Sequence, residues 1–143
     1  MPKINESELK KEIKSGDFKN AYLLYGEESY LKEYYANELK NKIVDKTFEA
    51  FNFHYFDGKD TELDDILKDA QMLPMMSEYN FVMVKDYPIE KSANDIKLLE
   101  EYLKDAPDTA VFVFWFDAIE PDVKSAKFKK VIKAFEKAGA KAN

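Results

Sequence analysis

A turn that could hold a phosphate group follows the first apolar run of the sequence, 21–25. It begins with Gly26 and reaches Lys32 six residues later. A P-loop needs a second glycine before its lysine and a serine or threonine after it, so that backbone N–H groups converge on the phosphate. Here the second glycine is absent, a glutamate follows the lysine, and Glu27 and Glu28 place negative charge where an anion would bind. We interpret the turn as a degenerate P-loop that binds no nucleotide; its marker residues are Gly26, Glu27, Glu28 and Lys32.

Other polar side chains indicate chemistry only weakly. Asp86 and Asp117 each follow an apolar run, where a carboxylate could hold Mg²⁺, and Asp117 is the better candidate. A single aspartate after a strand is, however, most often a turn former or a cap. His54 is the only histidine and the chain has no cysteine, so the sequence offers no partner for a catalytic triad or a metal. We find no catalytic constellation and expect neither a cofactor nor a metal ion.

An apolar hinge, Gln71–Met76, separates a helical pattern from a strand pattern. Five of its six residues are apolar, and the residue before Pro74 is disfavoured in a helix. Connecting segments usually run over the surface and are polar. The hinge therefore either folds into the core, where methionine fills gaps, or forms an exposed wedge for a partner. Residue statistics favour burial, and a mixed arrangement with Met72 inward and the rest outward is also open.

Composition limits the class of protein. The 143 residues are 45% hydrophobic, enough for one domain with its own core, either complete or cut from a longer chain. No apolar run approaches the roughly 20 residues that span a bilayer, and the charged start does not resemble a signal peptide. With no cysteines, this suits a cytoplasmic protein. The net charge of −6, without a basic block, disfavours direct DNA binding.

Strand patterns alternate with amphipathic helix patterns four times along the chain. This alternation predicts an α/β fold in which a parallel sheet carries helices on both faces, giving three layers. The second strand has a wetter face and is expected near an edge of the sheet. The last helix is expected to end at Gly139, with 138–143 beginning a linker. The expected strands are 21–25, 51–56, 81–84 and 111–116, and the expected helices are 5–14, 29–43, 61–73, 93–103 and 128–135.

A family resemblance lies in four segments: Tyr22–Leu31, Phe53–Gly58, Ala70–Glu78 and Phe81–Lys85. Together, in order and approximate spacing, they resemble the N-terminal domain of the delta subunit of the bacterial DNA polymerase III clamp loader. The resemblance implies a P-loop NTPase or AAA+-like fold that lacks a working nucleotide site. It also implies that residues 1–143 are one domain of a longer chain with a lid domain and a collar domain.

The same resemblance implies a function in DNA replication. Delta subunits bind the ring-shaped sliding clamp, the beta subunit, and favour an opened interface between its protomers. Other clamp-loader subunits bind and hydrolyse ATP, so the chain is expected to be no enzyme by itself. Contact with DNA is expected only through the assembled loader, and no membrane is implied.

The family's clamp-binding residues fall on Leu73, Met75 and Met76. The family often has Leu-Phe or Phe-Phe where this chain has Met75-Met76, and an aromatic side chain buries more area in a more rigid shape. The resemblance reverses the preference for burial, so we expect these side chains to be exposed. Two alternatives remain: a divergent P-loop or Rossmann-type nucleotide-binding enzyme, and a scaffold domain with another partner.

Overall fold

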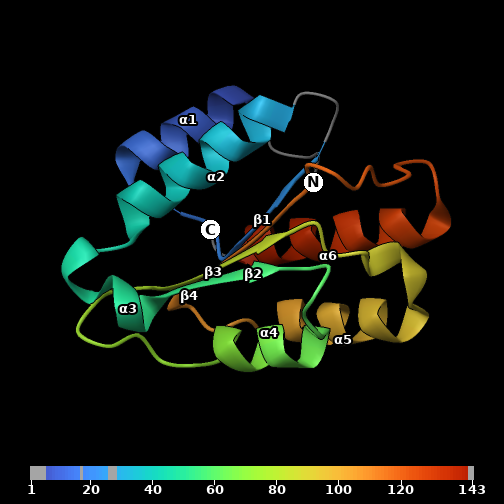
Figure 1. Cartoon of the computed structure of the whole chain (residues 1–143). Helices are drawn as coiled ribbons and strands as arrows, with labels where there is room; N and C mark the ends of the chain where they lie inside the picture. Colours follow the sequence, from blue (N-terminus) through green and yellow to red (C-terminus); the bar gives the residue numbers. More distant parts are fainter. Residues whose placement is uncertain (1–5, 17, 26–28, 142–143) are drawn as a thin grey trace.

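Parallel strands form the centre of the fold. The computed structural model describes residues 6–16, 18–25 and 29–141. Within these residues four parallel strands form one sheet in the order β1-β4-β3-β2 (Figure 1). This confirms the predicted α/β class and places β2 at an edge of the sheet, as expected from its wetter face. The strands are β1 Ala21–Leu24, β2 Phe53–Asp57, β3 Asn80–Lys85 and β4 Ala110–Trp115.

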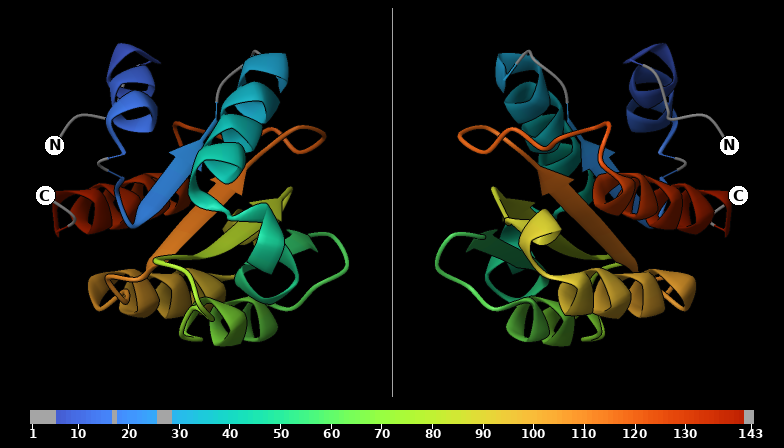
Figure 2. Two further views of the ribbon diagram at one scale, coloured as in Figure 1. Left: turned by 90° about the vertical axis from the view of Figure 1, so that its left-hand side faces the viewer. Right: turned by 90° about the vertical axis from the view of Figure 1, so that its right-hand side faces the viewer.

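Helices cover both faces of the sheet, so the described elements form three layers (Figures 1 and 2). The first two helices pack on one face, and the last three long helices pack on the other. The helices are α1 Glu6–Ser15, α2 Ser29–Ile43, α3 Glu49–Asn52, α4 Leu63–Ala70, α5 Ala93–Lys104 and α6 Ala126–Lys141, with short 3-10 turns η1 Lys46–Phe48 and η2 Ile89–Lys91.

Alternating side chains give each face of the sheet its own core. Successive residues of a strand point to opposite faces. On β4, Phe112 and Phe114 join the core beneath α4, α5 and α6. Val111, Val113 and Trp115 join the core beneath α1 and α2. Both faces of the inner strands are therefore apolar, and this explains the continuous apolar runs in the sequence.

The second strand begins two residues later than its alternating pattern predicted. Phe51 and Asn52 belong to α3, and the N–H of Phe53 still bonds to the carbonyl of Glu49. Phe51 is exposed, so its apolar character does not mark a core position. Asn52 is buried and directs its side chain toward the connection before β3. The predicted start at residue 51 was wrong because the alternation continued through a single helical turn.

Two helix ends also differ from the predictions. Helix α4 has the predicted stripe of Leu63, Ile66, Leu67 and Ala70, but it ends at Ala70 rather than near residue 73. The chain leaves the helix before Pro74 acts on it. Helix α6 runs through Gly139 to Lys141. Burial of Ala138 adds a packed turn, and this can offset the roughly 1 kcal/mol that glycine costs inside a helix.

Candidate functional site

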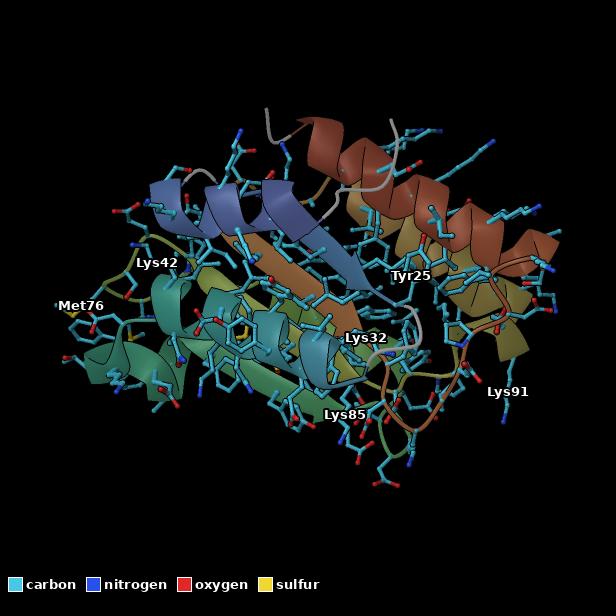
Figure 3. All side chains as sticks on the ribbon, turned by 90° about the horizontal axis from the view of Figure 1, so that it is seen from above. Tyr25, Lys32, Lys42, Met76, Lys85 and Lys91 are labelled. Atoms are coloured by element: carbon cyan, nitrogen blue, oxygen red, sulfur yellow. The ribbon has the colours of Figure 1, made fainter. Side chains whose placement is uncertain are left out.

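An exposed apolar loop joins α4 to β3, and we call its residues Met72–Met76 the apolar tip. Leu73 is 81% exposed and Met76 is 77% exposed, while Met72 and Met75 are about half exposed. These residues lie before the amino end of β3. In Figure 1 the yellow-green connection from α4 to β3 passes beside α3, and Figure 3 shows Met76 at one extremity of the molecule. Leu73, Met75 and Met76 are therefore on the surface, as expected from the resemblance, and Met72 is not turned inward.

A buried asparagine holds one end of the tip. The Nδ2 of Asn52 donates to the carbonyl oxygen of Met75 at 2.7 Å. The N–H of Met75 donates to Oδ1 of Asn52 at 2.6 Å. Asn52 is only 1% exposed. One side-chain amide thus binds both main-chain polar groups of Met75, much as a neighbouring strand would.

A second buried asparagine holds the other end. Asn80, the first residue of β3, donates from Nδ2 to the carbonyl oxygens of Asp69 at 2.9 Å and Met72 at 3.2 Å. The hydroxyl of Tyr102 donates to the adjacent carbonyl of Ala70. Carbonyl groups at the end of a helix lack partners within the helix. These donors satisfy the end of α4 and direct the chain into the tip.

Met76 has a left-handed backbone conformation with φ of 55°. A residue with a β-carbon is strained there, by about 1–2 kcal/mol, and such conformations persist where the surroundings impose them. The hydrogen bonds between Asn52 and Met75 fix the residue that directly precedes Met76. The turn at Met76 therefore belongs to the shape of the tip.

The segment that was predicted to be a degenerate P-loop follows β1 in the sequence. Gly26, Glu27 and Glu28 lie outside the described residues. Helix α2 already begins at Ser29, so residues 29–31 are helical where a P-loop would still curve around a phosphate. Lys32 is buried, and this burial lowers the pKa of its ammonium group against the opposing effect of Asp117, Asp86 and Glu120.

Asp86 uses its carboxylate to bind the main chain after β4. Its oxygens accept hydrogen bonds from the N–H groups of Asp117 at 2.7 Å, Ala118 at 3.2 Å and Ile119 at 3.1 Å. Burial alone would raise the pKa of Asp86, but these N–H donors hold it below its usual value. The carboxylate is therefore a clasp between two loops. Asp117, the residue favoured from sequence as a Mg²⁺ ligand, is exposed and lies 3.7 Å from the ammonium of Lys85.

His54 lies on β2 with Nδ1 3.5 Å from a carboxylate oxygen of Asp69 at the end of α4. Its side chain is mostly buried, in keeping with a packing position. Within residues 6–16, 18–25 and 29–141, no group of three histidine, aspartate or glutamate side chains is arranged to hold a metal ion. The described helices include none that is both long and apolar enough to cross a bilayer.

Sequence reasoning missed Asn52 and Asn80. Neither belongs to a motif, and an asparagine between apolar residues was interpreted as the polar side of a strand. The available signal was position: Asn52 directly precedes β2, and Asn80 is the first residue of β3. An amide there can reach the connection that enters the neighbouring strand.

The parallel sheet, its strand order and its two covered faces define an AAA+-like α/β domain. The model of the family "DNA polymerase III, delta subunit" matches residues 22–141. The chain therefore belongs to the DNA polymerase III delta subunit family of clamp-loader components, which act in DNA replication, and the family resemblance is confirmed.

Relatives support the same assignment. A DNA polymerase III subunit delta of Bacillus subtilis (strain 168) is 31% identical over 134 residues, covering 89% of this chain and 38% of the relative. The structure of the Bacillus subtilis DNA clamp loader delta protein matches with a TM-score of 0.74 at 27% identity, over 88% of this chain and 39% of that chain. A gamma subunit-related protein of Thermotoga maritima shares the fold, with a TM-score of 0.61 at 18% identity, over 91% of this chain and 43% of that chain. This chain thus spans about two fifths of the length of these proteins.

Proposed function

We propose that the apolar tip docks into a hydrophobic pocket of a ring-shaped sliding clamp and that docking promotes opening of the ring. The observation that carries this proposal is the exposure of Leu73 and Met76, the most exposed large apolar side chains among the described residues. Membership of a clamp-loader family supports the clamp as the partner. Leu73, Met75 and Met76 are the proposed contacts.

Burial of these side chains can supply much of the affinity. Each fully buried side chain of this size contributes roughly 1.5–3 kcal/mol. Micromolar affinity requires about 8 kcal/mol after the costs of association. Three anchors in a pocket reach this range only with help from the surrounding surface. Met75 and Met76 are flexible, so they fit a pocket by adaptation where an aromatic residue would fit by rigid shape.

Ring opening requires more than binding. A ligand with equal affinity for the open and closed ring shifts nothing, however tightly it binds. The tip is therefore proposed to anchor the chain, and the surface around it to fit the open ring better than the closed one. In this scheme residues 1–143 are the first domain of a longer cytoplasmic protein, whose other domains contact the remaining clamp-loader subunits.

The carboxyl end of the sheet is proposed to bind no ATP. Helical backbone from Ser29 and the clasp formed by Asp86 support this proposal. The chain is then no ATPase by itself. Other subunits supply ATP hydrolysis, and DNA is reached only through the assembled loader.

Calorimetric titration of this chain into the cognate clamp tests the proposal. We expect binding in the micromolar range or tighter, and a loss of at least tenfold in Leu73→Ala/Met76→Ala, since both side chains are largely in solvent and dispensable for the fold. Val123→Ala is the matched control, because Val123 is also exposed but lies between β4 and α6. A wild-type chain that does not bind would overturn the proposal and favour a scaffold with another partner.

A further inference from the structure

We infer that Asn52 is a positioning residue, which together with Asn80 holds the apolar tip in its binding shape before a partner arrives. This inference rests on the proposed clamp docking of the tip. Asn52 binds Met75 through both of its amide atoms, and Asn80 binds Met72. The main chain is thus held at both ends of the tip, and Leu73, one of the proposed anchors, lies between them.

The two asparagines act on the main chain of the tip, and its side chains remain exposed. Apolar residues in a loose loop would collapse onto the nearest apolar surface, because burial of apolar area is favourable. Leu73 is nevertheless 81% exposed. Hydrogen bonds from buried amides to the main chain hold the loop in place without covering the side chains that a partner would contact.

Both asparagines are fixed on the frame of the sheet. Asn52 directly precedes β2 and Asn80 begins β3, and each is 1% exposed. The N–H of Asn80 also donates to the carbonyl of Thr109 at 2.8 Å, which ties it to the start of β4. A loop attached to such rigid positions has already lost the freedom that binding would otherwise remove, and preorganisation of this kind raises affinity.

Asn20 provides an internal control for this arrangement. It is buried and directly precedes β1. Its Nδ2 donates to the carbonyls of Pro107 and Asp108, before β4, and of Ala110, the first residue of β4. It therefore does for the connection into β4 what Asn52 does for the connection into β3. Asn20 does not bond to the apolar tip. Substitution of Asn20 should weaken the fold in the same way but leave clamp binding intact.

The experiment compares Asn52→Ala with Asn20→Ala in two measurements. The first is hydrogen exchange of the Met75 amide by NMR in the free chain, which needs no clamp. Asn52→Ala should accelerate this exchange at least tenfold relative to the wild type, and Asn20→Ala should not. The second is calorimetric affinity for the clamp, which should fall roughly tenfold to a hundredfold in Asn52→Ala although Leu73, Met75 and Met76 are unchanged.

Asn52→Asp is the second variant, for use if Asn52→Ala does not fold. It has nearly the same volume and retains an acceptor for the Met75 N–H, but it cannot donate to the Met75 carbonyl when ionised. Its clamp affinity should also fall. Wild-type affinity in a folded Asn52 variant, or unchanged exchange of the Met75 amide in Asn52→Ala, overturns the inference while the clamp proposal stands. Failure of the wild type to bind the clamp overturns both.

Discussion

At the carboxyl end of the sheet, polar groups turn inward and bind the chain itself, whereas at the amino end apolar groups point into solvent. Asp86 binds the main chain of 117–119. Lys32 is buried, and the charge of Asp86 acts on its ammonium group. Met76 lies at the opposite end (Figure 3), and Leu73 of the same loop is also largely exposed. Open α/β sheets ordinarily bind ligands at the carboxyl ends of their strands. In this domain the carboxylate of Asp86, at the usual ligand end, binds the main chain, and the candidate contact surface lies at the other end.

The largest expected loss of stability comes from removing the carboxylate of Asp86 at the carboxyl end of the sheet. Asp86→Ala should lower the free energy of unfolding by about 3 kcal/mol, because three part-buried main-chain N–H groups lose a charged acceptor. Asp117→Ala is the control and should cost less than about 1 kcal/mol, since its pair with Lys85 is exposed. Urea unfolding followed by circular dichroism measures both. Equal losses in the two variants would contradict the role of Asp86 as a clasp.

Acid provides a check on the same clasp. The pKa of Asp86 is lowered by folding, so its ionised form contributes stability that is present above its unfolded pKa of about 3.9 and is lost as the pH falls through the lower folded value. Asp86→Asn cannot ionise. The stability difference between the wild type and Asp86→Asn should therefore shrink when unfolding is measured at progressively lower pH below about 4. A constant difference would show that charge at Asp86 is irrelevant.

A smaller difference in stability is expected at Met76, in the apolar tip at the amino end of the sheet. Met76→Gly should be about 1 kcal/mol more stable than Met76→Ala, because glycine accepts a φ of 55° without strain. Both variants remove the side chain and should bind the clamp with equally reduced affinity. Thermal unfolding compares their stabilities. If alanine proves as stable as glycine, the left-handed turn is not a property of the free chain.

The smallest expected effect is on nucleotide binding. ATP at one hundred times its dissociation constant would stabilise a binding protein by about 2.7 kcal/mol. We expect millimolar ATP with Mg²⁺ to leave the melting temperature of this chain unchanged. A control with an unrelated ATP-binding protein establishes the sensitivity of the assay. A rise of several degrees would favour the alternative of a divergent nucleotide-binding enzyme.

The inner part of the fold follows closely from the sequence, because buried parallel strands leave continuous apolar runs. Phe81–Val84 and 111–116 were identified as strands for this reason. The first lies within β3, and the second lies within β4 except for Phe116, which follows the end of that strand. The stripe of α4 was equally clear. These features depend on local periodicity, and local periodicity is visible in a single sequence.

The candidate site was less predictable because its shape depends on distant contacts. Residue statistics favoured burial of the hinge, and only the family resemblance indicated an exposed tip. Helix α4 ends at Ala70 because Asn80 and Tyr102 donate to carbonyl groups in its last turn. These donors lie 11 and 32 residues along the chain from the carbonyls that they bind. The late start of β2 reflects a bond from Asn52 to a residue in another connection. No local pattern contains these pairings.

The bonds between Asn52 and Met75 span 23 residues and connect the approaches to two adjacent parallel strands. Parallel strands need a crossover connection, and contacts between distant positions form slowly. The shape of residues 72–76 therefore depends on β2 lying beside β3. The tip acquires its shape only in a chain whose sheet has assembled. Incompletely folded molecules carry the same residues without that shape, so in the proposed docking they would compete poorly for the clamp.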